Sequence, residues 1–265
     1  MKVNDCNKYF KLCDSMPVSL EFLSDRMGSI FFDYEFFKNL GDVSLDTFLE
    51  LLMANNAPFF RNERNLIDIN TKNIALTDCT FCFVDIETTS CSVDDGQIIE
   101  IGALKVRNGE VLGEFESLIY SPFVPEEIEN LTGITPRMLE DAPSLKNVMR
   151  DFLRFLGDSV FVGHSVSFDY GFISNTIDRY GIAPLLNPRL CTLALSKKAI
   201  LSQRHGLGHL NAMLGINTPT AHRALADAIT SFEVFKICQL ALPYSVKSLQ
   251  DLIDFTRGKI GYPLP

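Results

Sequence analysis

The sequence contains no run of 18 uncharged apolar residues, which a helix needs in order to cross a membrane. A secretory signal peptide also needs an apolar stretch, but the first residues read MKVNDCNKYFKLCDSM. Internal repeats and low-complexity segments are absent as well, so a repeat architecture is not expected. We therefore expect a cytoplasmic protein without membrane contact.

Acidic side chains outnumber basic side chains in this sequence. It has 24 Lys and Arg against 33 Asp and Glu, a formal net charge of −9. Because Lys and Arg at phosphates drive most non-specific binding to nucleic acid, a broad electrostatic attraction to a polyanion is not expected. If the substrate is nucleic acid, metal ions must supply much of the local positive charge.

The seven cysteines do not form the even, regularly spaced set of a disulfide framework, and their scatter fits reduced thiols in a cytosolic protein. Cys79 and Cys82 form a CxxC, but it runs into an apolar strand-like stretch without a second Cys or His pair nearby. We interpret this CxxC as incidental, and neither a zinc site nor a redox site is predicted from it.

The 265 residues exceed the usual size of one domain, so a smaller appendage is expected beside the main domain. Residues 1–75 form a separate accessory region, because nine of the 21 Phe fall there. SLDTFLELLMAN predicts a helix capped by Ser44, and RNLIDIN alternates like a short strand. This small, mainly helical region is compatible with a winged-helix-like unit. Arg61 and Arg64 are its only clustered basic residues, which favours a packing module over nucleic-acid contact.

Residues 76–243 form the main domain, which begins with strands and continues with alternating helices and strands. FCFVDIETT predicts a strand, and Asn108-Gly109 between two apolar alternating runs predicts a hairpin. A helix, a short strand and two further helices are predicted in SLKNVMRDFLRFLG, SVFVGH, FDYGFISNTIDRYG and RALADAITSFEVFKICQLAL. This order predicts an α/β fold with a mixed sheet. Residues 244–265 add a C-terminal helix, SLQDLIDF, and a tail.

Asp85 and Glu87 interrupt the apolar strand FCFVDIETT. Because strand side chains alternate, both acids point to one face and could share a metal. Acids in an apolar run are costly to bury unless cations pair with them. Taken alone, an ordinary polar strand end explains the pair equally well.

Two further segments carry reactive residues. Asp169 follows an apolar strand and begins a helix, where ligand sites of α/β sheets form, although an acid stabilised by the helix dipole is common there. His222 and Asp227 are five positions apart, ~140° around a regular helix, so they do not share a face. We expect His222 on a loop or helix start, suited to taking a proton from water, and Asp227 suited to holding a metal.

In the order DxE, strand then Asp, and HxxxxD, these residues resemble the DEDDh (DnaQ-like) 3′→5′ exonuclease family. The resemblance covers about residues 78–242 through DIETTS, QIIEIGAL, LTGIT, GHSVSFDYGF and HRALADA. These segments are most similar to the proofreading epsilon subunit of bacterial DNA polymerase III and the PolC exonuclease domain. The resemblance implies a ribonuclease H-like mixed central sheet flanked by helices. Its implied metal ligands are Asp85, Glu87, Asp169 and Asp227, and its implied general base is His222.

The resemblance also implies a pocket for the 3′-terminal nucleotide, lined by residues that flank the acids. These are Thr88, Thr89, Leu131, Thr132, His164 and Phe168. Cys91 stands where Leu or Met is frequent in the family, and Ser165 where Asn is frequent. Neither departure touches the catalytic set.

By the same resemblance, two divalent cations ~3.5–4 Å apart activate the attacking water and stabilise the leaving 3′ oxygen. Nucleoside 5′-monophosphates are the products. Oxygen-rich ligation favours Mg²⁺ or Mn²⁺ over zinc. Single-stranded or frayed 3′ ends of DNA are the expected substrate, and a DNA polymerase subunit is the expected partner.

Two alternatives to a proofreading exonuclease remain. The first is an RNA-trimming exonuclease of the RNase T or oligoribonuclease type, because the catalytic residues do not distinguish sugars and only a contact at the 2′-OH would. The second is a non-catalytic polymerase-binding adaptor. An adaptor of that kind should have lost an acid or the histidine, and all five are present.

QLALP at residues 239–243 resembles the peptide by which bacterial proteins dock on the sliding clamp, but Pro243 replaces an aromatic residue. The preferred interpretation is the buried end of the last domain helix. On that interpretation the core includes Phe232, Phe235, Leu240 and Leu242.

Overall fold

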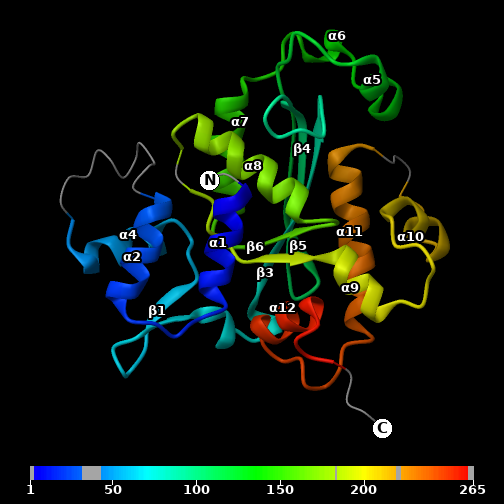
Figure 1. Ribbon diagram of the computed structural model, residues 1–265. Helices are drawn as coiled ribbons and strands as arrows, with labels where there is room; N and C mark the ends of the chain where they lie inside the picture. The colour runs from blue at the N-terminus through cyan, green and yellow to red at the C-terminus, as the bar shows by residue number, and fades with distance from the viewer. Residues whose placement is uncertain (1–2, 32–42, 183, 219–221, 262–265) are drawn as a thin grey trace. The chain divides into compact units, whose positions relative to one another are not determined.

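The structure, a computed structural model, describes residues 3–31, 43–182, 184–218 and 222–261. The chain divides into two compact units (Figure 1). The first comprises Met1–Asn73 and Gly171–Pro188, and the second comprises Ile74–Tyr170 and Arg189–Pro265. The boundary falls inside helix α8 (Ser167–Arg179). Among the described residues, none of the helices has the length and hydropathy that crossing a membrane requires.

The first unit is mainly helical. Ser44 caps one of its helices as predicted, since its hydroxyl accepts a hydrogen bond from the Thr47 N–H. The predicted strand in RNLIDIN is present and pairs with a strand that the sequence patterns did not indicate. Val18 bridges to Ile67 and extends this ribbon by one residue. The elements are α1 (Val3–Cys13), α2 (Leu20–Phe31), α4 (Leu45–Ala54), β1 (Phe59–Arg61) and β2 (Ile67–Ile69).

The second unit is built on a five-stranded mixed sheet in the order β5-β4-β3-β6-β7. Strand β4 pairs antiparallel with both β3 and β5, whereas β6 and β7 run parallel to β3. The predicted hairpin turn is present, with positive φ of 49° at Asn108 and 81° at Gly109. The strands are β3 (Thr80–Thr88), β4 (Ile98–Arg107), β5 (Glu110–Leu118), β6 (Val160–Gly163) and β7 (Arg189–Cys191).

Helices cover both faces of this sheet (Figure 1). Opposite residues of antiparallel strands share a face, so Asp85, Gly102 and Glu116 point one way. The backbone of α11 lies against Gly102 on that face. Phe115 points the other way and packs on Phe152 of α7, with ring centroids 5.9 Å apart. The helices are α5 (Glu126–Thr132), α6 (Pro136–Leu139), α7 (Leu145–Leu156), α9 (Thr192–Ala199), α10 (Leu207–Met213), α11 (Ala224–Gln239) and α12 (Leu249–Arg257).

The main core of the second unit lies between β3, β6 and the helices α9, α11 and α12. Phe232 and Phe235 are buried there, as predicted, and pack on Phe83. The prediction for Leu240 was wrong, because its side chain is 88% exposed. Helix α11 ends at Gln239, so Leu240 lies beyond the part of the helix whose apolar face packs on the core.

Candidate active site

Asp85 and Glu87 project from the end of β3 toward α11. They lie directly opposite Gly102 and Glu100 of β4, so all four residues share the face that α11 covers. The register of the two strands shifts just after Glu87. This bulge ends the regular ladder at the two acids and leaves them at the edge of the packed core.

Asp169 reaches the same place from a different element. It lies in the first turn of α8, which follows β6, the parallel neighbour of β3. The backbone N–H of Ile86 hydrogen bonds to its carboxylate, which puts Asp169 beside the segment between Asp85 and Glu87. A Cβ at Gly163 would lie only 3.1 Å from Oδ2 of Asp169, so glycine makes room for the acid at the end of β6.

His222 and Asp227 come from the start of α11. His222 lies in the turn before the helix and is exposed, as expected for a residue that approaches from a different direction than Asp227. Its φ of 60° is in the left-handed region. Glu87, His222 and Asp227 each offer a ligand atom, and these atoms all lie within 4.8 Å of one another. The five reactive residues predicted from the sequence therefore come from three adjacent elements of the second unit.

Burial, and for some of them neighbouring charges, raises the pKa of each of the four acids. Burial and then the charges of Asp169, Asp227 and Glu87 raise the pKa of Asp85 well above its ordinary range. Burial, followed by the charge of Asp227, raises the pKa of Glu87 to about 8. Burial also raises the pKa of Asp169 to about 7 and that of Asp227 above its usual range. Crowded carboxylates of this kind favour bound cations, which offset both the repulsion and the loss of hydration.

The donor set fits hard divalent cations. Four carboxylates offer oxygen ligands, which suit Mg²⁺ or Mn²⁺ better than the sulfur-rich sets that zinc prefers. The cysteines do not compete for that role, because burial raises the pKa of Cys79 and Cys82 to about 12. Both thiols therefore stay protonated at neutral pH in the metal-free protein.

Three threonines predicted to line the nucleotide pocket use their hydroxyls within the protein. Thr88 Oγ1 donates to the carbonyl of Ser90 at 2.9 Å, and Thr89 Oγ1 accepts from the N–H of Gln97 at 3.0 Å. Thr132 Oγ1 donates to a carbonyl of α5 and accepts from the N–H of Ile134. These hydrogen bonds stabilise the local turns that contain the three threonines.

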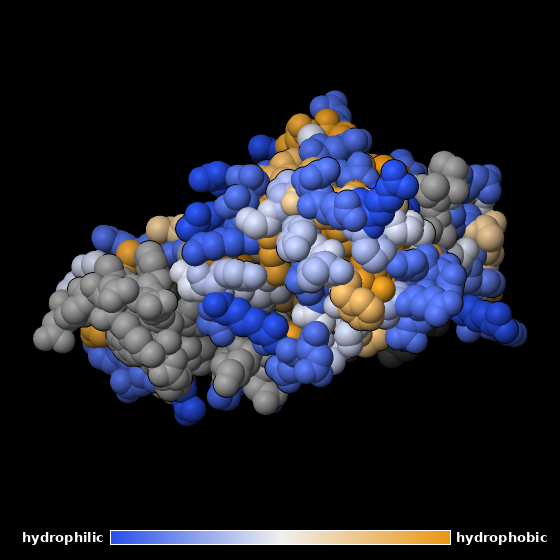
Figure 2. Space-filling model, turned by 90° about the horizontal axis from the view of Figure 1, so that it is seen from above, coloured by the Kyte–Doolittle hydropathy of each residue, from blue (hydrophilic) through white to orange (hydrophobic). Residues whose placement is uncertain are grey.

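Leu131 and Phe168 differ from the threonines, because their apolar side chains are 51% and 36% exposed. Exposed apolar residues interrupt an otherwise largely hydrophilic surface in the view of Figure 2. Phe168 directly precedes Asp169, and Leu131 directly precedes Thr132 on α5. Both side chains are therefore accessible from solvent.

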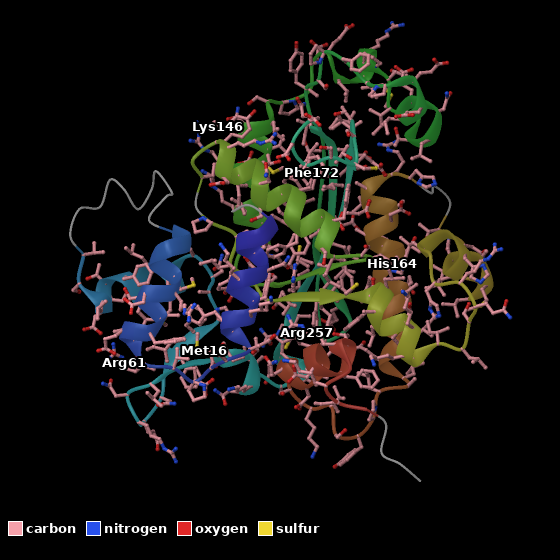
Figure 3. All side chains as sticks on the ribbon, viewed as in Figure 1. Met16, Arg61, Lys146, His164, Phe172 and Arg257 are labelled. Atoms are coloured by element: carbon pink, nitrogen blue, oxygen red, sulfur yellow. The ribbon has the colours of Figure 1, made fainter. Side chains whose placement is uncertain are left out.

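His164, labelled in Figure 3, follows β6. Each of its two ring nitrogens lies within hydrogen-bond distance of a partner. Nε2 lies 2.7 Å from the carbonyl of His205, which can only accept, so Nε2 carries the proton. Nδ1 lies 3.0 Å from Oγ1 of Thr192. Burial lowers the pKa of His164, so the ring is neutral and joins β6 to the loop before α10.

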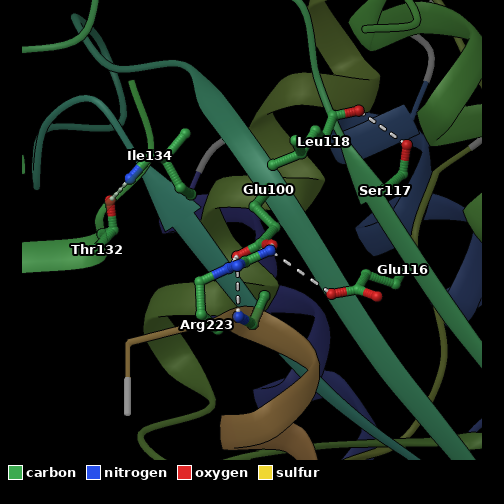
Figure 4. A network of polar contacts seen from close by, with 8 residues as sticks. Glu100, Glu116, Ser117, Leu118, Thr132, Ile134 and Arg223 are labelled. Carbon is green, nitrogen blue, oxygen red and sulfur yellow. Dashed lines mark hydrogen bonds and ion pairs between the residues drawn. The ribbon is translucent and has the colours of Figure 1, made fainter. Parts of the chain in front are cut away.

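Glu100 and Arg223 were not singled out from the sequence. Glu100 is fully buried, and its carboxylate lies 2.7 Å from Nη2 of Arg223 (Figure 4). Arg223 also lies 3.8 Å from the Glu116 carboxylate. An available signal was the acid in the apolar run QIIEIGAL, since a buried carboxylate requires a partner.

Comparison with known proteins bears on this site. The profile of RNase_T, described as an exonuclease, matches residues 82–235. The chain is 36% identical over 188 residues to the DNA polymerase III subunit epsilon of Aquifex aeolicus, covering 69% of this chain and 93% of that protein. It is 38% identical over 167 residues to a PolC-type DNA polymerase III of Staphylococcus aureus, covering 62% of this chain but 12% of the polymerase.

Solved structures are similar in fold. E. coli exonuclease I in complex with a dT13 oligonucleotide superposes with a TM-score of 0.56 at 19% identity, over 62% of this chain and 41% of that one. Exonuclease X in complex with 5′ overhanging duplex DNA gives 0.50 at 22% identity, over 66% of this chain and 99% of that one. These likenesses confirm the ribonuclease H-like mixed sheet flanked by helices.

Proposed function

The chain belongs to the RNase_T exonuclease family, and from this premise we propose that it hydrolyses DNA from the 3′ end to nucleoside 5′-monophosphates. The observation that carries the proposal is the convergence of β3, α8 and α11. They bring Asp85, Glu87, Asp169, His222 and Asp227 to one place. A degenerate adaptor has no reason to keep four clustered carboxylates whose pKa values are all raised above their ordinary range.

The four acids would hold two divalent cations, Mg²⁺ or Mn²⁺. When bound, the cations supply charge neutralisation at the phosphodiester and acidify the attacking water. His222, exposed beside Glu87 and Asp227, would take the proton of that water. Its place before α11 lets the imidazole approach the phosphate from outside the carboxylate cluster.

The 3′-terminal nucleotide would lie against the exposed apolar side chains of Leu131 and Phe168. A ring next to Asp169 can stack on a base of any sequence, which suits an enzyme that trims ends without sequence preference. Thr88, Thr89, Thr132 and His164 would act differently. Their hydrogen bonds within the protein would shape the walls of the proposed pocket.

DNA proofreading beside a replicative polymerase is the proposed role, and a polymerase subunit is the proposed partner. The supporting observation is that both relatives above carry the name DNA polymerase III, one matched over nearly its whole length. RNA trimming is the alternative outcome, and the substrate test below distinguishes the two.

The first unit is proposed to be an accessory module of winged-helix-like topology. Its order of helix, single-residue bridge at Val18, helices and a two-stranded ribbon supports this assignment. Helix α4 carries Asp46 and Glu50 and no basic residue. Such a helix is unsuited to contact phosphates, so the unit is proposed to contact protein.

A sliding clamp is a second proposed partner, through residues 239–243. Leu240 is 88% exposed and free to enter an apolar pocket, whereas Pro243 is buried. A clamp-binding peptide should displace the protein from the clamp. Binding that the peptide leaves unchanged would contradict this contact.

The decisive experiment compares 5′-labelled single-stranded DNA, a duplex with a mismatched 3′ end, and RNA of the same sequence. Each is incubated with Mg²⁺, Mn²⁺ or a chelator. Metal-dependent shortening of DNA from its 3′ end, lost in Asp169→Ala and His222→Ala, is expected. Asp158→Ala and His209→Ala change an exposed acid and an exposed histidine outside the cluster and serve as controls. Preferential shortening of RNA would move the protein to the trimming class, and no shortening would favour the adaptor.

A further inference from the structure

The start of α11 packs directly against strand β4 at Gly102. A Cβ on Gly102 would lie 2.1 Å from the backbone nitrogen of Leu225, so the helix backbone rests directly on the strand. Gly102 lies opposite Asp85. The absence of a side chain at this position therefore brings the first turn of α11, with Asp227, within reach of the acids on β3.

Glu100 lies two residues earlier on the same face of β4. Its side chain binds the start of α11 to the strand. Its carboxylate accepts hydrogen bonds from Nε of Arg223 at 2.9 and 3.2 Å and from Nη2 at 2.7 Å. It also accepts from the backbone N–H of Ala224 at 3.0 Å. Arg223 is the N-cap residue of α11, and Ala224 is its first residue. One buried side chain thus holds both the cap and the first free N–H of the helix (Figure 4).

Arg223 lies between His222 and Asp227, which the proposed reaction uses. His222 precedes it, and Asp227 follows within the first turn of the helix. The φ of 60° at His222 is a conformation that non-glycine residues rarely adopt, and it persists only where the surroundings determine it. The fixed position of Arg223 and the hydrogen bond from the His222 N–H to Asp227 provide those constraints.

The ion pair between Glu100 and Arg223 also neutralises the charge of a buried carboxylate. Glu100 is a fifth carboxylate beside four acids, and it lies opposite Glu87. Because Arg223 forms a bidentate ion pair with it, this carboxylate is already satisfied and does not compete for a cation. The side chain of Glu100 is fully buried, while that of Arg223 is 33% exposed.

From this geometry we infer that Glu100 and Arg223 are positioning residues of the exonuclease site. Their ion pair sets where α11 begins and so holds His222 and Asp227 at the metal-binding acids. This inference rests on the proposed function. Neither residue is assigned contact with the substrate.

The test uses the full-length variants Glu100→Gln, Arg223→Gln and Arg223→Lys. Steady-state kinetics on 5′-labelled single-stranded DNA give kcat and KM, and titration with Mn²⁺ followed by electron paramagnetic resonance gives metal affinity without relying on activity. Removing a residue that orients a metal site typically lowers affinity or rate by roughly 10- to 100-fold. We expect a loss of that size in kcat and in Mn²⁺ affinity for Glu100→Gln and Arg223→Gln, with KM little changed.

Conservative rescue separates positioning from general stability. Arg223→Lys keeps the charge but loses the bidentate fork, so its kcat should lie between those of wild type and Arg223→Gln. Arg154→Gln on α7 breaks an exposed ion pair with Asp151 and serves as the matched control. All assays run at least 15 °C below the melting temperature of each variant, so that the folded fraction is constant.

Wild-type kcat and Mn²⁺ affinity in both Gln variants would overturn the inference, whether or not their melting temperatures fall. If wild-type protein shortens no nucleic acid, the proposed function fails. The Mn²⁺ titration then still decides whether the ion pair positions the acids.

Discussion

The backbone N–H of His222 donates a hydrogen bond to Oδ2 of Asp227, 3.0 Å away. One carboxylate oxygen of Asp227 thus closes the turn that carries the histidine, and the other stays available as a ligand. The proposed metal-binding role of Asp227 and the placement of His222 are therefore coupled through one side chain.

His222→Asn separates the chemistry of the imidazole from the shape of the turn. Asparagine adopts positive φ more readily than most residues and keeps the backbone N–H. Asp227 should stay in place, so Mn²⁺ affinity should be unchanged while kcat falls by roughly 10²- to 10⁴-fold, the usual contribution of a general base. Single-turnover kinetics would measure the loss. A variant that keeps its rate would show that another group takes the proton.

The metal-free protein should lose stability as pH rises. The pKa of Glu87 is raised from 4.5 to about 8, and that of Asp169 to about 7. An acid whose pKa is higher in the folded state holds its proton longer when folded, so unfolding releases protons and stability falls with pH. The fall should lie between about pH 4.5 and 8 for Glu87.

Thermal unfolding in a chelator between pH 5 and 8.5 measures this effect. Glu87→Gln should flatten the dependence, and saturating Mg²⁺ or Mn²⁺ should raise the melting temperature most at the alkaline end. At 100 times its Kd, a ligand stabilises the folded state by about 2.7 kcal/mol. A melting temperature that rises with pH in the chelator would contradict the assignment of mutually destabilising acids.

Gly102→Ala should displace α11. The added Cβ would meet backbone atoms of Leu225 and Ala224 at 2.1–2.4 Å, which cannot move as a flexible side chain could. We expect a loss of about 1–3 kcal/mol in the free energy of unfolding, as for other overpacked sites, together with loss of nuclease activity. Gly208→Ala on α10 has open space around the new Cβ and should be neutral or slightly stabilising. Equal stabilities of the two variants, measured in urea, would refute the close approach.

Leu131→Ala and Phe168→Ala should weaken binding of the 3′ end. A stacked aromatic contributes roughly 1–3 kcal/mol per base, and we expect KM for single-stranded DNA to rise accordingly for Phe168→Ala, with a smaller rise for Leu131→Ala. Mn²⁺ affinity should stay unchanged, because neither side chain is a ligand. Leu201→Ala removes a fully exposed leucine elsewhere and is the control. A fall in kcat at constant KM would argue against a role in binding.

Local chemistry explains what could be predicted. The alternation in FCFVDIETT places Asp85 and Glu87 on one face whatever packs there, and Asn108-Gly109 favours a tight hairpin turn. Ser44 caps its helix by accepting a hydrogen bond from the N–H of Thr47, three positions further along the chain. The spacing of His222 and Asp227 likewise keeps them off one helix face. Such features depend on neighbours in the chain, and a single sequence shows them.

Other features depend on what tertiary packing brings together. The ion pair between Glu100 and Arg223 joins residues 123 positions apart, and no local pattern encodes it. The approach of Asp169 to Ile86 requires β6 to lie parallel beside β3. The exposure of Leu240 is decided by where α11 ends against the core. Local patterns in the chain therefore identify the candidate catalytic residues. Only the placement of α11 and of the first turn of α8 beside β3 brings their charges together, because burial and repulsion act through space.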